Sequence, residues 1–166
     1  MLFRSLSIAD VERNIPRFAA YREHIKRCEP VGAFVNDQIA VANWLFCHED
    51  RDYAWKRGEE MVATFGYMAG QTVEISEAYP ASNYTAIGLL GTLRPDPHAP
   101  DQQKPLASGL CFGDPAQLIE TVGRWEAAGA DHLVFMIQAR ETVRQQEVMD
   151  SLRLFAREVM PHFSGN

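Results

Sequence analysis

The sequence predicts an α/β protein whose strands are parallel. Three short apolar runs, at 39–47, 109–113 and 132–137, alternate with stretches in which apolar residues recur at helical spacing. The runs lack the clean polar–apolar alternation of a half-exposed strand, so we expect strands that are buried on both faces. The 166 residues are predicted to form one domain over 1–166. This pattern leaves two architectures open: a small three-layer open sheet, or part of a (β/α)8 barrel.

Two helices are expected in the first half of the chain, one on each side of the first strand. A short turn that Ser7 can cap precedes the first helix, which begins afresh at Pro16 because proline lacks an N–H that the first turn would leave unused. The motif "EPVG" ends this helix. Asp50 or Asp52 can cap the second helix, and Gly70 is placed to end it.

One polar residue interrupts the first predicted strand. Asn43 lies inside an otherwise apolar run. A buried amide costs free energy unless it is hydrogen-bonded, so Asn43 either faces a polar pocket or bonds a neighbouring loop.

The stretch 71–108 is predicted to be a variable insertion loop, because it contains several prolines and glycines and shows little periodicity. Loops of this length are often active-site lids or binding loops. Tyr79 and Tyr84 lie near its start, where they can stack on a flat substrate or anchor the loop by apolar packing.

Helix boundaries are marked most clearly in the second half. Asp114 is a cap residue, Pro115 fits the first helical position, and Gly129 suits a left-handed stop. Pro161 ends the last helix. The predicted order is therefore helix, strand, helix, long loop, strand, helix, strand, helix.

Composition narrows the class of partner and the compartment. Apolar residues make up 46% of the chain and charged residues 23%, which is typical of a globular protein. The net charge of -6 argues against nucleic acid and against an anionic membrane surface as partners. The three cysteines form neither a disulfide framework nor a metal motif, and the N-terminal segment lacks the apolar core of a secretory signal. We therefore expect a cytoplasmic protein without a metal site.

The most specific part of the sequence is its C-terminal end. The stretch "CFGDPAQLIETVGRWEAAGADHLVFMIQ", followed by "VMDSLRLFAREVMPHF", resembles the end of the luciferase-like flavin monooxygenases. The shared features are Gly113 with Pro115, the Ala-Gly that closes the next helix, the strand that begins at 131–134, and the final 155–161 segment. The middle stretch "PVGAFVNDQIAVANWLFCHEDRDYAWKRG" is similar to the sixth strand of that family and its following helix.

The resemblance implies a TIM-type (β/α)8 barrel and a reduced flavin, either FMN or a deazaflavin, that a separate reductase supplies. It also implies oxygen insertion into a small organic substrate. Such a barrel needs on the order of 250 residues, whereas this chain has 166. We therefore expect a partial barrel: about the last three βα units and a leading helix, with the N-terminal barrel half absent or the reading frame truncated.

Candidate site residues follow from the rule that active sites lie at the carboxyl ends of parallel strands. His48 is the candidate catalytic acid or base, and its alternative is an exposed histidine before a helix cap. Gly113 opens a helix N-terminus that can hold a cofactor phosphate, although the carboxylate of Asp114 competes for it. Gln138 can bond the edge of a flavin or close a loop, and Cys47 can line the substrate pocket or lie in the core.

Two functions remain open. The first is a luciferase-like flavin-dependent monooxygenase, and the second is a non-catalytic flavin-binding or structural half-barrel that acts as a dimer. Three strands of buried type leave unpaired backbone groups at a sheet edge. We therefore expect either a homo-oligomer or a missing barrel half to cover that edge.

Overall fold

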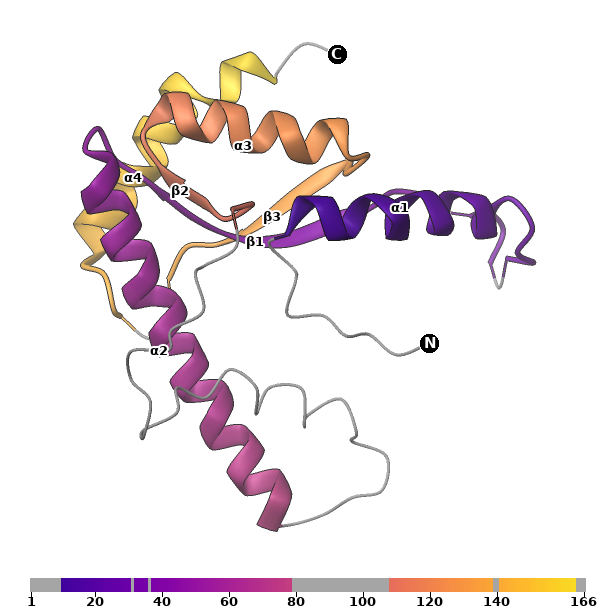
Figure 1. Ribbon diagram of the computed structural model, residues 1–166, viewed down its shortest axis with the longest axis horizontal. Coiled ribbons are helices and arrows are strands. Elements are labelled where there is room, and N and C mark those ends of the chain that lie inside the picture. Colours follow the sequence, from indigo (N-terminus) through magenta and orange to yellow (C-terminus); the bar gives the residue numbers. More distant parts are fainter. Residues whose placement is uncertain (1–9, 31, 36, 79–107, 139–140, 164–166) are drawn as a thin grey trace.

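The computed structural model describes residues 10–30, 32–35, 37–78, 108–138 and 141–163. Helices and strands alternate along the chain in the predicted order (Figure 1). The elements are α1 (Val11–Ile25), β1 (Ala40–Cys47), α2 (Arg51–Ala78), β2 (Cys111–Gly113), α3 (Pro115–Ala127), β3 (His132–Met136), α4 (Gln145–Glu158) and the 3-10 helix η2 (Met160–His162).

The three strands form an open parallel sheet in the order β2-β1-β3. The last three residues of β1 pair with β2, so that Leu45 lies beside Cys111. The first five residues of β1 pair with β3, so that Ala40 lies beside His132. The predicted α/β class and the parallel direction of the strands are confirmed. The first strand in the chain is the central one, whereas barrel strands taken in chain order would place β2 in the centre.

The strand order places helices on both faces of the sheet. The chain steps from β1 to β2 on one side and then returns past β1 to β3. Because crossovers between parallel strands are right-handed, this reversal of direction puts α2 and α3 on opposite faces. In Figure 1, α3 lies above the strands and α2 runs below them.

The packing of β1 agrees with this layering. Trp44 and Phe46 pack in a cluster with Met61 of α2, whereas Leu45 packs in a separate cluster with Leu118 of α3 and with α4. Each of these three β1 side chains is at most 7% exposed. The carboxyl half of β1 is therefore buried on both faces, as its apolar run predicts.

The first helix differs from the prediction. α1 is a single helix that begins at Val11, and Pro16 lies inside it rather than at its start. Asp10 caps the helix and accepts a hydrogen bond from the backbone N–H of Arg13 at 3.2 Å. Val11 is 3% exposed and packs against Trp125, which anchors this first turn. Capping and burial of the first turn outweigh the cost of about 3 kcal/mol that an interior proline imposes. The proposed cap Ser7 lies outside the described residues.

The second helix is longer than predicted. Asp50 caps it, because its Oδ1 accepts the backbone N–H of Tyr53 at 3.0 Å. The helix then continues through Gly70 to Ala78, so the predicted loop cannot begin at residue 71. A glycine inside a helix costs only about 1 kcal/mol, and no proline follows it before Ala78. The remaining loop residues, 79–107, lie outside the described residues.

The boundaries predicted in the second half are confirmed. Asp114 caps α3 by accepting the backbone N–H of Gln117 at 2.8 Å, and Pro115 is the first helical residue. Gly129 has a φ of +97°, the left-handed conformation that a glycine adopts without strain. α4 ends at Glu158, shortly before Pro161.

Asn43 bonds a neighbouring segment of the chain. Its amide Nδ2 donates to the carbonyl of Gly109 at 2.8 Å, and Trp125 Nε1 donates to the same carbonyl at 2.8 Å. Asn43 and Trp125 are both 0% exposed. The two donors hold the turn that leads into β2, which settles the alternative that the sequence leaves open. Within the described ranges, no helix combines the length and apolar character needed to cross a membrane.

Candidate functional site

The carboxyl ends of β1 and β2 meet at one edge of the sheet. The backbone N–H of His48 donates to the carbonyl of Gly113 at 3.1 Å, which extends the pairing one residue beyond β1. On the same edge, Arg51 bonds Asp114 Oδ2 through Nε at 2.9 Å and through Nη2 at 2.8 Å. We call His48, Arg51, Tyr53, Gly113 and Asp114 the carboxyl-edge site. The structure thus brings together two of the residues that the sequence predicts, His48 and Gly113.

Hydrogen bonding fixes the tautomer of His48. Its Nδ1 accepts the backbone N–H of Asp50 at 3.0 Å, so that nitrogen carries no proton. The neutral ring therefore holds its proton on Nε2, which becomes the donor of the ring. The imidazole packs against the ring of Tyr53, with 4.7 Å between ring centroids and an interplanar angle of 49°. His48 is exposed, so its Nε2 N–H is a suitable donor to a ligand at this edge.

Hydrogen bonds and an ion pair between Tyr53, Arg57 and Glu147 fix the position of the Tyr53 side chain. The Tyr53 hydroxyl donates to Glu147 Oε2 at 3.2 Å, and Arg57 donates to the same oxygen from Nε at 3.1 Å and from Nη2 at 2.7 Å. The Arg57 guanidinium also lies 5.6 Å from the centroid of the Tyr53 ring. The hydrogen bond from Arg57 is the main reason that the pKa of Glu147 lies below its usual value of 4.5. The network joins α2 to α4 and holds the tyrosine ring against His48.

The backbone conformation at position 113 and the nearby side chain of Gln117 both favour a glycine there. Its φ is +146°, and a Cβ atom built there would lie 2.2 Å from Gln117 Oε1. Gln117 itself fills that space, and its Oε1 also accepts Trp55 Nε1 at 3.1 Å. The close approach at Gly113 is therefore made by a side chain of the protein rather than reserved for a ligand.

The first turn of α3 does not fit a phosphate. The carboxylate of Asp114 already accepts a backbone N–H of that turn and pairs with Arg51. These two contacts, the bond from Gln117 first, lower the pKa of Asp114 below its usual value. Asp114 is therefore ionised at neutral pH, and its negative charge repels an anion. A cofactor phosphate would need another part of the chain.

Cys47 lies in the core rather than on a pocket wall. It is 1% exposed and packs between β1 and the helices α3 and α4. Burial raises the pKa of its thiol to about 12, so the thiol is protonated and unreactive at neutral pH. Its backbone N–H donates to the Ser151 hydroxyl at 2.7 Å, which ties α4 to the end of β1. This position gives no support to substrate contact by Cys47.

Gln138 closes the loop between β3 and α4. Its Oε1 accepts the backbone N–H of Val143 at 3.2 Å, and its Nε2 donates to the carbonyl of the same residue. Both polar atoms of the Gln138 amide therefore bond the loop. This is the second of the two roles that the sequence allows for Gln138, the first being contact with a flavin. Tyr79 and Tyr84, the predicted substrate contacts, lie outside the described residues.

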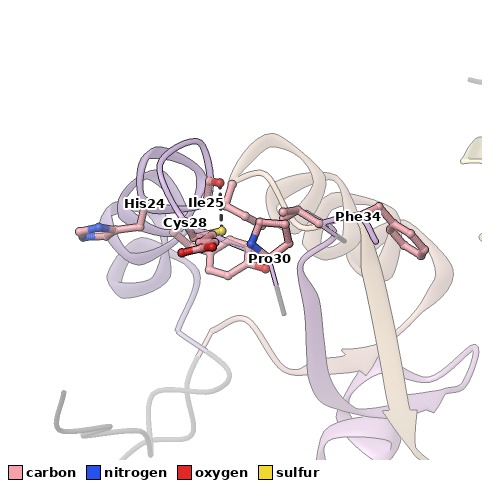
Figure 2. Close-up of a pocket in the computed structure, with 8 residues that line it drawn as sticks. His24, Ile25, Cys28, Pro30 and Phe34 are labelled. Carbon is pink, nitrogen blue, oxygen red and sulfur yellow. Dashed lines mark hydrogen bonds between the residues drawn. The ribbon is translucent and has the colours of Figure 1, made fainter. Parts of the chain in front are cut away.

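Two hollows in the described part of the chain lie away from the carboxyl-edge site. One of about 400 Å³ lies at the end of α1 and is lined by Tyr21, His24, Ile25, Cys28, Glu29, Pro30, Phe34 and Val35. Figure 2 shows these side chains, with Cys28 Sγ donating to the carbonyl of Ile25 at 3.2 Å. This segment leads into the amino end of β1, the opposite end from the one at which α/β sheets bind ligands. The other hollow, of about 280 Å³, lies beside β3.

Sequence reasoning did not identify the residues that surround His48. Arg51 and Tyr53 lie within five positions of it, so the motif "HEDRDY" contained a signal for their proximity. Glu147 carried no such signal, because it lies 94 residues from Tyr53 and meets it only through the packing of α4.

Comparisons with known proteins show the fold. No family model matches the chain, and no curated protein matches it significantly. Among solved structures, the chain is similar to the coenzyme F420-dependent tetrahydromethanopterin reductase from Methanopyrus kandleri, with 16% identity and a TM-score of 0.52. The match covers 94% of this chain and 44% of that one, so this chain spans less than half the length of the reductase. This chain therefore has a parallel α/β fold that matches part of the fold of the reductase.

Proposed function

We propose that this chain binds a reduced flavin or deazaflavin at the carboxyl-edge site and belongs to a flavin-dependent oxidoreductase. The observation that carries the proposal is the placement of His48. It lies at the carboxyl end of the central strand, with its tautomer fixed by Asp50 and its ring held by Tyr53. The fold likeness to a reductase that depends on coenzyme F420, a deazaflavin, supports the same cofactor class.

The residues at this edge fit the ring of such a cofactor better than its phosphate. The His48 Nε2 N–H can donate to a carbonyl or ring nitrogen of the cofactor, and the Tyr53 ring that packs against the imidazole holds this donor in place. Asp114 keeps the phosphate away from the first turn of α3. When bound, the cofactor would supply the redox chemistry, while the protein orients the substrate and excludes water.

Within this class of oxidoreductase, we propose more specifically a monooxygenase. It would take reduced FMN from a separate reductase and insert oxygen into a small organic substrate. In that reaction His48 would hold or move a proton near the flavin edge. The resemblance of the C-terminal sequence to the luciferase-like enzymes supports this proposal.

A titration of the purified protein with FMN and, separately, with coenzyme F420 tests the proposal through ligand fluorescence. We expect saturable binding of at least one of them. His48→Ala should weaken binding by roughly tenfold. The variant loses one hydrogen bond between neutral groups and one ring contact, which together contribute about 1–2 kcal/mol to the free energy of binding.

The matched control is His24→Ala, which removes an exposed histidine from the hollow at the end of α1. We expect it to leave the affinity unchanged. Weaker binding in His24→Ala together with unchanged binding in His48→Ala would move the cofactor to the α1 hollow and refute the carboxyl-edge site. The absence of binding at excess of either cofactor would refute the proposal altogether.

A second candidate is a flavin-binding or structural module without turnover. It is favoured by the positions of the two hollows, which lie at α1 and β3 rather than beside His48, within the residues that the structure describes. Oxygen uptake with reduced FMN and a panel of small organic substrates separates the two candidates. An enzyme of the first kind should take up oxygen faster with at least one of the substrates, whereas a binding module should show no substrate-dependent uptake.

A further inference from the structure

The two helices that begin at the carboxyl-edge site both carry a carboxylate at the cap position. α2 follows β1 and has Asp50 as its cap, and α3 follows β2 and has Asp114. We propose that this site recognises a flavin by its ring alone, so that riboflavin, which lacks the phosphate of FMN, binds at least as tightly as FMN. This inference rests on the proposed function and deepens it, because it names the form of the ligand that the site takes.

The first turn of α3 has its backbone donors in use. A helix N-terminus binds a phosphate through free N–H groups, but Pro115 has no N–H. The N–H of Gln117 donates to Asp114 Oδ1 at 2.8 Å, and the N–H of Ala116 interacts with the same carboxylate. The N–H of Leu118 donates to the carbonyl of Asp114 at 3.0 Å. Residues 115–118 therefore leave no backbone donor for a phosphate.

The start of α2 is closed to an anion in a similar way. Asp50 Oδ1 accepts the N–H of Tyr53 at 3.0 Å, and the N–H of Asp50 donates to His48 Nδ1 at 3.0 Å. Glu49 precedes this cap, Asp52 lies in the first turn of the helix, and both are exposed. A phosphate monoester carries about two negative charges at neutral pH, so these carboxylates repel it, whereas the ring of an oxidised flavin is neutral.

The nearby guanidinium groups already hold carboxylates. Arg51 bonds Asp114 Oδ2 at 2.9 Å and 2.8 Å. Arg57 bonds Glu147 at 2.7 Å and Glu60 at 2.6 Å. A phosphate would have to displace a charge-assisted hydrogen bond to reach either cation. A ring that accepts a hydrogen bond from His48 needs no counter-charge.

The first turn of α4 is the competing position for a phosphate. Arg144 occupies its cap position, and no side chain caps this helix. Against a phosphate stands Glu147, which lies in the same turn and whose pKa is lowered by its hydrogen bond from Arg57. All three helices that follow the strands thus carry a carboxylate at the cap or in the first turn, where it disfavours a second anion.

Titration of the purified chain with riboflavin and with FMN, followed by flavin fluorescence, tests the proposal. We expect the Kd of riboflavin to be equal to that of FMN or below it. Asp114→Asn keeps a good capping residue and removes one negative charge, so it should tighten FMN binding by roughly threefold relative to riboflavin. The matched control is Glu126→Gln, which removes the same charge from an exposed position at the other end of α3 and should leave the ratio of the two Kd values unchanged.

The comparison in the wild-type chain needs no variant and separates this inference from the proposed function. Tighter binding of FMN than of riboflavin would overturn the inference alone and leave flavin binding in place. Loss of that preference in Arg144→Gln would then put the phosphate at α4. An unchanged ratio in Asp114→Asn would also overturn it, because the carboxylate would not be what keeps the phosphate away. If neither flavin binds at excess, the inference fails together with the flavin form of the proposed function.

Discussion

At the scale of single residues, the fit of α2 against the sheet depends on Gly58. A Cβ atom built at Gly58 would lie 2.3 Å from Cδ2 of Phe112. The Phe112 ring is 0% exposed and packs edge-on against Trp55, with 5.7 Å between centroids, so it has little room to move. This glycine lets the helix approach β2 closely.

We expect Gly58→Ala to lower the free energy of unfolding by about 1–3 kcal/mol, because overpacking outweighs the gain of about 1 kcal/mol in helix propensity. Gly123→Ala is the control, because a Cβ at that position in α3 meets nothing within 4 Å. It should raise stability by up to about 1 kcal/mol. Chemical denaturation measures both, and an equal gain in the two variants would show that the contact at Gly58 is wrong.

The residues of the site were predictable only where a local rule applied. His48 and Gly113 follow from the carboxyl ends of apolar runs, and the structure places them in contact through one backbone hydrogen bond. The roles of Gln138 and Cys47 depended on packing that the sequence does not encode locally. Gln138 bonds Val143 across a loop, and Cys47 faces helices that come much later in the chain.

At the scale of elements, the contact between α2 and α4 depends on Glu147. Its carboxylate accepts bonds from Tyr53 and Arg57 of α2, and its side chain is 26% exposed. The pKa of Glu147 is lowered in the folded protein. A group with a lowered folded pKa contributes stability that is complete above its unfolded pKa and is lost as the pH falls through the folded one.

We therefore expect Glu147→Gln to destabilise the protein at neutral pH by about 1–2 kcal/mol, a figure reduced for partial exposure. The difference from wild type should shrink as the pH falls below the usual value of 4.5. Glu59→Gln, at an exposed position on α2, should change stability by less than about 0.5 kcal/mol. Urea denaturation as a function of pH measures both variants. A deficit that does not vary with pH would contradict an ionic origin.

Element boundaries were predictable where capping chemistry is local. Asp114 with Pro115 and the left-handed Gly129 mark both ends of α3 in sequence and in structure. Pro16 misled the prediction, because the cap at Asp10 and the burial of Val11 start the helix earlier than the proline rule suggests. Gly70 misled it in the same way, since one glycine did not end α2.

At the scale of the whole molecule, the parallel direction of the strands was predictable and their order was not. Three apolar runs separated by helices imply right-handed crossovers and a parallel sheet. The choice of neighbour depends on pairing between distant segments, such as Val41 with Leu133, and the apolar runs are too alike to encode it. Among the strands that the structure describes, the order β2-β1-β3 makes β1 central and places β3 at an edge.

The central claim is that ligand chemistry takes place at the carboxyl ends of β1 and β2. Backbone amide chemical shifts during a titration with FMN or coenzyme F420 test it most directly. We predict that the shifts concentrate at His48, Tyr53 and Gly113 and leave the segment 21–35 unchanged. Shifts confined to the α1 hollow, or no shift at saturating cofactor, would contradict the account.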